Sequence, residues 1–359
     1  MSSPRPVIAS VGLIVLVMGG AALAQKPQEQ VFKDKQGRLK LWNMDSHEIR
    51  VQNQGPIRFE GEGRPIKGIS QDQGLTLECL SLTADLATLK GKGYVLQSAD
   101  LTGSVSILQA KQGASRSFKG DRLKLDDSGS AATVTLSRPF DMVEKAKVEG
   151  GDATRTLSAN SGVISLDTLQ SSKGEFRSAS AEGAVVFVLN EPLRETTLKS
   201  GRAEIRQGQG FYAFDLPSAF NLNGSNKPKP GEQNIFSASA DSGKASIQET
   251  AAPGESSLIS LDLRGNVTLH ITSKVKTEKG ERTRIVKAKS SSLAFARESG
   301  LMILGGGVAY SLDSIESGED PIEAEGASET LEITFDKSGK LVNASAKSGK
   351  TTVKQGGKP

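Results

Sequence analysis

The chain has 359 residues, of which 36% are hydrophobic and only 4% aromatic, and its 45 basic and 41 acidic residues leave a net charge of +4. This low share of hydrophobic and aromatic residues argues against a large globular enzyme with a deep core. It suits a long β-array, in which each thin layer buries only a narrow apolar stripe. The charges are mixed along the chain without a basic block, so nucleic-acid binding is not expected. A single cysteine, Cys79, excludes an intramolecular disulfide and is expected to be a small buried hydrophobe.

The N-terminal segment has the pattern of a targeting sequence. Residues 7–23 form an almost unbroken apolar run that ends in Ala-Leu-Ala, directly before Gln25. This pattern predicts a secretory signal peptide over residues 1–24, cleaved between Ala24 and Gln25. The run is also close to the length that spans a bilayer, so an uncleaved membrane anchor stays open as an alternative. Both interpretations place the rest of the chain outside the cytoplasm, with residues 25–35 as a polar linker.

A faint repeat of about 40 residues continues through the rest of the sequence. Its copies begin with a small polar residue and continue with two apolar residues spaced by two, as in SGVISL (161–166), SGRAEI (200–205), SGKASI (242–247), SSSLAF (290–295) and SETLEI (328–333). A spacing of two is the period of a β-strand and not of a helix. The repeat therefore predicts an all-β fold, a repetitive antiparallel β-jellyroll or solenoid-like stack of about eight such units.

A second element follows in most units: a glycine, then a short alternating strand. Examples begin at Gly103, Gly183, Gly265 and Gly306. Because glycine tolerates backbone conformations that a Cβ would forbid, it predicts a turn or bulge at the strand entry. An insertion rich in proline and glycine at 223–231 divides the repeats into two expected blocks, 36–222 and 232–354.

Motifs for catalysis or metal binding are missing from the sequence. Its two histidines, His47 and His270, have no partner at metal-ligand spacing, and His270 is expected on the outer face of a strand. The triplet at 305–307 is the glycine position of the repeat and does not precede a helix, so it is not a phosphate loop. The sequence thus predicts a protein that is not an enzyme, with no metal and no cofactor.

The two strand types together resemble the OstA-like family, the β-jellyroll domain of lipopolysaccharide-transport proteins of the LptA and LptC type. The best segments are 236–243 leading to 261–269, and 286–295 leading to 301–308. The resemblance implies a periplasmic protein of outer-membrane biogenesis that shelters the acyl chains of lipopolysaccharide or another glycolipid in an apolar groove. It also implies a bridge built by strand addition at exposed end strands, with other lipopolysaccharide-transport proteins and by weak self-association. Retention of residues 7–23 would tether the chain to the inner membrane, whereas cleavage would free it.

The two strand types and the resemblance together predict which residues line the groove and which strands form its ends. We expect the groove to be lined by the inward apolar residues of the repeats: Val105, Ile107, Ile164, Leu166, Val185, Phe187, Ile247, Val267, Leu269, Ile271, Leu293, Phe295, Val308, Tyr310, Leu331 and Ile333. We expect end-to-end assembly through Leu39 and Leu41 at one end and through Thr351 and Val353 at the other. Two other functions stay open: a structural or adhesive β-solenoid at the cell surface, and a β-helix enzyme acting on polysaccharide.

Overall fold

The computed structural model describes residues 32–33, 40–42, 49–50, 57–60, 65–70, 75–89, 93–111, 114–128, 131–148, 150–167, 176–248, 256–278, 280–336 and 339–355. In these residues the regular structure is strand throughout, and every described strand pair is antiparallel, so the all-β prediction is confirmed. The predicted signal peptide, the cleavage site and His47 lie outside the described residues.

The chain divides into two compact units, Met1–Val148 with Asp152–Ala184, and Glu149–Gly151 with Val185–Pro359. The division therefore falls earlier than the expected break at 223–231. Part of that expected flexible insertion is strand, because β16 runs to Asn226 and pairs directly with β17. Only the loop that joins these two strands follows the prediction.

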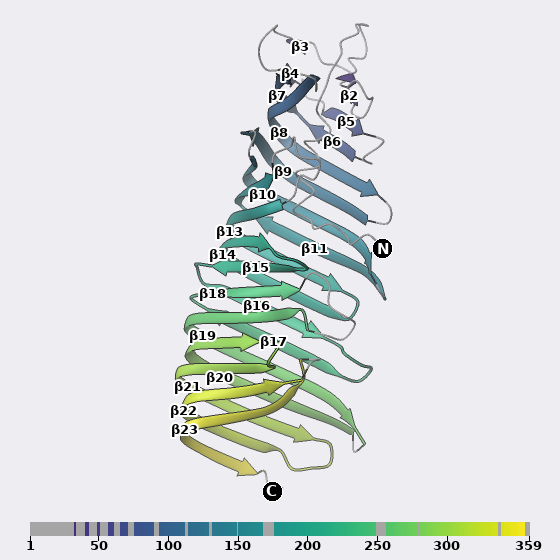
Figure 1. Ribbon diagram of the computed structural model, residues 1–359. Helices are drawn as coiled ribbons and strands as arrows, with labels where there is room; N and C mark the ends of the chain where they lie inside the picture. The colour runs from purple at the N-terminus through teal and green to yellow at the C-terminus, as the bar shows by residue number, and fades with distance from the viewer. Residues whose placement is uncertain are drawn as a thin grey trace. The chain divides into compact units, whose positions relative to one another are not determined.

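The strands of the N-terminal unit are short at first and then long (Figure 1). They are β1 (Phe32–Lys33), β2 (Lys40–Trp42), β3 (Ile49–Arg50), β4 (Ile57–Glu60), β5 (Ile66–Ser70), β6 (Leu75–Cys79), β7 (Ser81–Leu89), β8 (Gly93–Lys111), β9 (Ala114–Asp127), β10 (Ala131–Val148), β11 (Gly151–Ala159) and β12 (Ser161–Asp167).

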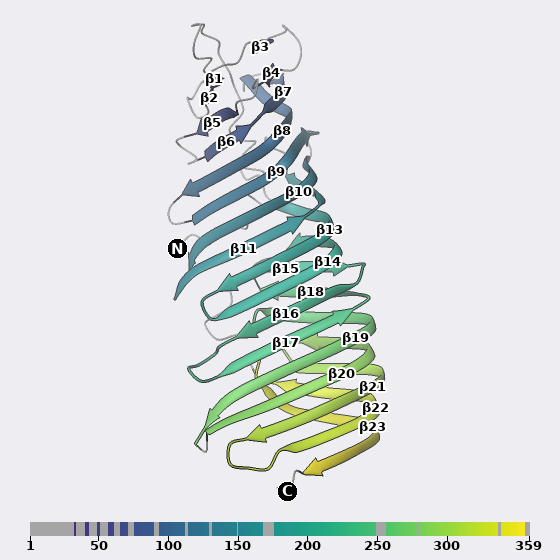
Figure 2. The same ribbon diagram turned by 180° about the vertical axis from the view of Figure 1, so that it is seen from behind.

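The division between the units falls within β13 (Phe176–Glu191). The C-terminal unit continues with β14 (Arg194–Gln207), β15 (Phe211–Leu216), β16 (Phe220–Asn226), β17 (Gln233–Ala240), β18 (Ser242–Gln248), β19 (Leu258–Thr277), β20 (Gly280–Ala296), β21 (Leu301–Glu316), β22 (Ile322–Phe335) and β23 (Leu341–Gln355). From β19 onward each strand pairs with the next one along the chain, and the strands follow one another in order in both views (Figures 1 and 2).

The recurring glycines of the sequence repeat mark bends within long strands. The glycine expected at strand entries instead lies inside one long strand: β8 bends at Gly103, β13 at Gly183, β19 at Gly265 and β21 at Gly306, all with positive φ. At each of these bends the following residue also has positive φ, and in β8, β19 and β21 the two residues are skipped in the pairing register. Each long strand thus consists of two legs joined at a bend.

The repeat's small polar residue sits at the bend of the other strand type. The hydroxyls of Ser200, Ser290 and Ser328 each donate to the carbonyl oxygen two residues later, at 2.7, 2.9 and 2.8 Å. All three serines are buried, and this local bond satisfies a hydroxyl that would otherwise cost free energy in the interior. The serine at the start of the repeated segment is therefore a bend residue.

Candidate functional site: an interior pocket with a polar rim

Fifteen of the sixteen expected groove residues have described side chains, and these lie on the inner faces of the two units. Fourteen are buried, Phe295 is half-buried, and the side chain of Leu166 lies outside the described residues. Within the C-terminal unit, Phe187 packs against Tyr212 and Phe214 with ring centroids 5.8 and 5.0 Å apart. The side chains of the protein itself therefore fill most of the interior that they line.

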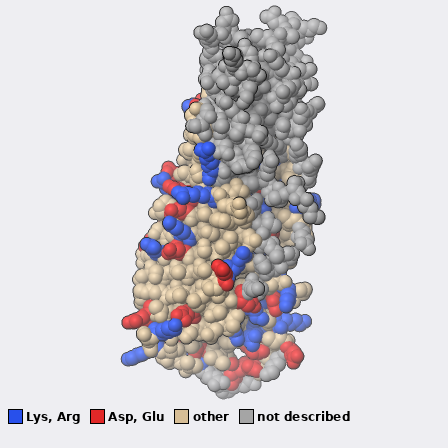
Figure 3. All heavy atoms as spheres, in the orientation of Figure 1, with Lys and Arg blue, Asp and Glu red and all other residues tan. Residues whose placement is uncertain are grey.

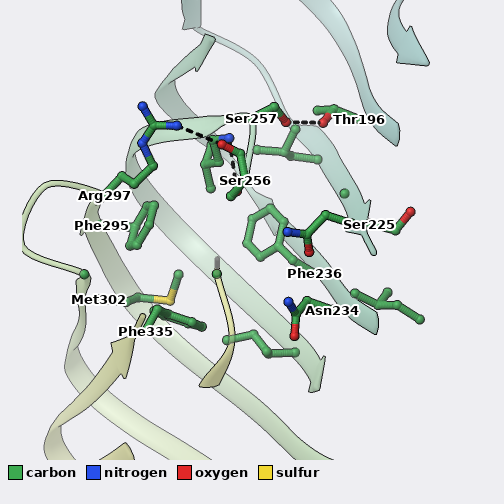
Figure 4. Close-up of a pocket in the computed structure, with 18 of the residues that line it drawn as sticks. Thr196, Ser225, Asn234, Phe236, Ser256, Ser257, Phe295, Arg297, Met302 and Phe335 are labelled. Atoms are coloured by element: carbon green, nitrogen blue, oxygen red, sulfur yellow. Dashed lines mark hydrogen bonds between the residues drawn. The ribbon is translucent and has the colours of Figure 1, made fainter. Parts of the chain in front are cut away.

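Open space remains in a pocket of the C-terminal unit to which Ile271 and Phe295 contribute (Figure 4). The space between its atoms, counted together with the solvent open to it, is about 770 Å³, so the enclosed part is smaller. Strands β14, β16, β17, β19, β20, β21 and β22 supply its walls. Its floor is apolar and is formed by Leu222, Phe236, Leu258, Ile271, Phe295, Met302 and Phe335. Phe295 and Phe335 meet edge to face with centroids 5.8 Å apart.

Polar groups gather at the rim of this pocket. Thr196 and Ser257 share a hydrogen bond of 2.6 Å between their hydroxyls, and Arg297 donates from Nη1 to the carbonyl oxygen of Ser256 at 2.8 Å. Figure 4 shows both bonds at the top of the view, above the rings of Phe295, Phe236 and Phe335. An apolar floor with a few convergent polar groups is the usual composition of a small-molecule site.

A row of polar residues extends this rim along the unit. In-register partners on successive strands are, in order, Arg194, Asn226, Asn234, Ser273, Arg284 and Ser314. We call this set the rim row. The first four are buried, and the Ser273 hydroxyl donates to Oδ1 of Asn234 at 2.9 Å. Since side chains two residues apart on a strand share a face, the rim row lies on the same inner face as the apolar rows.

The apolar rows begin two residues away. The nearest contains Phe236, Ile271, Val286 and Leu312, and the next contains Leu198, Leu222, Ala238, Leu269, Ala288 and Tyr310. The inner face of this unit is therefore amphipathic across its width, with one polar edge beside apolar rows. Sequence reasoning missed the rim row, because it assigned Asn226 to a loop and treated polar residues in strands as outward. The sequence did carry one signal of the rim row. Asn234 is a polar residue at a position where the alternating strand pattern would place an apolar one, directly before Ile235 and Phe236.

The groups considered for chemistry are dispersed. His270 is exposed on β19 and lies 3.4 Å from the hydroxyl of Thr272. Cys79 is buried, as expected, and burial raises the pKa of its thiol to about 12. No group of three or more histidine, cysteine or carboxylate side chains that could hold a metal occurs within the described ranges.

The two expected assembly edges differ. Leu39 lies outside the described residues, and Leu41 belongs to β2, which pairs with β1 on one side and β5 on the other. At the other end, β23 pairs with β22, and no other described strand pairs with it. Thr351 and Val353 are exposed there, although they continue the inner rows, and Val353 is 63% exposed. Inner-face side chains are thus uncovered at this end of the C-terminal unit.

In the described part of the face shown in Figure 3, basic and acidic side chains lie close together along the left edge and toward the bottom, around a largely uncharged centre. In the part of the chain that the structure describes, no helix is long and apolar enough to cross a membrane. No known family model matches the chain, and no curated protein gives a significant sequence match.

Proposed function

We propose that the protein is a non-enzymatic, periplasmic binding and transport protein for lipopolysaccharide or a related glycolipid, exported by its N-terminal segment. Acyl chains enter the interior of the β-stack, and the polar part of the ligand stays at its rim. The observation that carries the proposal is the pocket in the C-terminal unit, with aromatic and aliphatic side chains below and polar groups at the edge. The resemblance to the OstA-like family supports the same ligand class.

Binding of this kind needs no bond-breaking chemistry. Each methylene removed from water contributes about 0.8 kcal/mol, so an acyl chain that buries several methylenes gains enough free energy for useful affinity. The pocket has room for only part of a large glycolipid, and further room would come from separation of the buried inner rows. Rearrangements of more than about 2 Å on binding occur in a substantial minority of complexes.

The uncovered end of the C-terminal unit supports the second half of the proposal, which is a place in a bridge. An edge strand with free backbone groups accepts a strand from another chain, and the exposed inner side chain of Val353 would then be covered. A second copy of this chain or another lipopolysaccharide-transport protein would extend the apolar rows. Lys350 and Lys354 flank this edge and limit uncontrolled pairing.

A fluorescent fatty acid tests ligand binding. We expect saturable binding to the purified chain, weakened at least tenfold by Phe295→Glu, which places a charge on the apolar floor. The matched control is Ala294→Glu, because Ala294 is the neighbouring residue on β20 and is exposed on the opposite face. Equal binding by both variants, or no saturable binding by the unchanged protein, would refute the pocket as an acyl site.

One observation favours a second candidate, a structural β-solenoid. Most of the expected groove residues are buried by the chain's own side chains, as in a closed and dry core. The fatty-acid experiment separates the two proposals, because a purely structural stack has no saturable site for the probe.

A further inference from the structure

Two arginines occupy inner-face positions next to each other at the end of the rim row. Arg284 pairs in register with Ser273 and Ser314, and Arg282 pairs with Val275 and Glu316 two residues closer to the hairpin. Both side chains are partly buried. An arginine on the inner face of a β-stack is unusual, because charged groups are costly to bury without a partner.

The two guanidinium groups share a single carboxylate. Arg282 lies 3.9 Å from Glu316, whereas Arg284 forms no ion pair within 4.0 Å with any described residue. Arg284 donates from Nη1 to the carbonyl oxygens of Leu341 and Val342 at 3.3 and 3.0 Å, and its Nη2 and Nε form no hydrogen bond with a residue that the structure describes. Burial and the nearby charge of Arg282 lower the pKa of Arg284 from its ordinary value. These three side chains thus carry one positive charge in excess, and among the described residues most donors of the Arg284 guanidinium have no acceptor.

This cluster continues the rim of the pocket. Asn234 lines the pocket and accepts a hydrogen bond from Ser273, and Arg284 is the next residue in the row after Ser273. Beside the two arginines runs the apolar row with Ile271, Val286 and Leu312. A ligand with its chain on the apolar row would therefore place its polar end within reach of the guanidinium groups.

We propose that Arg284, assisted by Arg282, binds the anionic group, a phosphate or a carboxylate, of the amphipathic ligand that enters the interior of the C-terminal unit. The proposal rests on the proposed function and names the chemical class of the ligand's polar end. Arginine suits this role because its planar fork of donors matches the oxygens of phosphate and carboxylate in a bidentate manner. Such an anion supplies the negative charge that the cluster lacks and uses the donors at Nη2 and Nε.

The test compares two amphiphiles with the same chain, dodecyl phosphate and dodecyl glucoside, on the full chain. We expect dodecyl phosphate to bind more tightly, and Arg284→Gln to weaken its binding about tenfold while changing that of dodecyl glucoside less than twofold. Arg284→Lys retains the charge and is expected to keep part of the preference. Arg264→Gln is the matched control. Arg264 is an exposed arginine on β19, so this substitution removes the same charge from the outer surface of the protein.

The outcomes separate this inference from the proposed function. If Arg284→Gln lowered the binding affinity for both amphiphiles equally, the role of the arginine would be to hold β23 in place through its backbone hydrogen bonds. This result would overturn the anion site. An unchanged preference for dodecyl phosphate would overturn it as well, with acyl binding intact. Failure of the unchanged protein to bind either amphiphile would refute the proposed function itself. Inorganic phosphate is then the second probe: competition at millimolar concentration that Arg284→Gln abolishes supports an anion site that recognises phosphate without the chain.

Discussion

The side chain of Asp241 fills the space where Gly265 lacks a Cβ. A Cβ on Gly265 would lie 2.5 Å from Oδ2 of Asp241, and Gly265 has a φ of +73°. The backbone N–H of Asp241 donates to the Gly265 carbonyl oxygen at 3.0 Å, and the amide of Asn266 donates to Oδ2 of Asp241 at 2.8 Å. The same close approach recurs between Asn160 and Gly183, and between Leu80 and Gly103.

Substitution of Gly265 by alanine is expected to destabilise the protein by about 2–3 kcal/mol. About 1–2 kcal/mol comes from the left-handed conformation of an L-residue, and the rest from displacement of Asp241. Gly307→Ala is the control, because Gly307 also has positive φ, at +80°, but no atom lies within 4 Å of its added Cβ. Urea unfolding of both variants measures their free energies of unfolding. If both substitutions lowered the free energy of unfolding equally, the contact with Asp241 would contribute nothing to the cost at Gly265.

The repeat, the strand type and the inner apolar residues were predictable from the sequence, because a period of two and a recurring glycine leave few alternatives. The place of the glycines in mid-strand was not predictable, since a bend and a strand entry both favour positive φ. The rim row was missed for another reason. Asn226, Asn234 and Arg284 become neighbours only through pairing registers, and one sequence does not show those registers.

Glu144 is the centre of a buried ionic cluster in the N-terminal unit, with Arg155 at 3.0 Å and Arg116 at 3.0 Å. Glu144→Gln should lower the free energy of unfolding by about 3–5 kcal/mol, because it takes the carboxylate from the buried guanidinium of Arg155 and from the part-buried one of Arg116. The matched control is Asp152→Asn, which breaks the exposed pair with Lys147 and is expected to change stability by less than about 0.5 kcal/mol. Thermal unfolding of the two variants gives the comparison. Similar melting temperatures would contradict an energetic role for the cluster.

Cys79 should resist modification and make stability dependent on alkaline pH. Its folded pKa is raised to about 12 from an ordinary value of 9.0, because burial disfavours the thiolate. The unfolded chain therefore loses this proton first, and the stabilising contribution, complete below pH 9, decreases as pH rises toward 12. Urea unfolding between pH 8 and 10.5 should have a steeper pH dependence in the unchanged protein than in Cys79→Ala. Rapid labelling of the native thiol by a disulfide reagent at pH 8 would contradict its burial.

Val353→Pro should reduce end-to-end association. The substitution removes a backbone donor and disturbs the conformation of β23, the strand whose outer edge has no described partner. Val353→Thr keeps the donor and a β-branched side chain, and should retain association. Light scattering over a range of protein concentrations measures the effect. A strict monomer at high concentration, with both variants unchanged, would exclude self-association through this edge.

Photo-crosslinking in cells tests lipid transport most directly. A benzophenone amino acid at position 295 faces the pocket, and the same amino acid at position 294 faces outward from the neighbouring position on β20. The proposed function predicts that position 295 captures lipopolysaccharide or another glycolipid and that position 294 does not. Capture at position 294 alone, or at neither position in cells that make the glycolipid, would contradict transport through the interior of the β-stack.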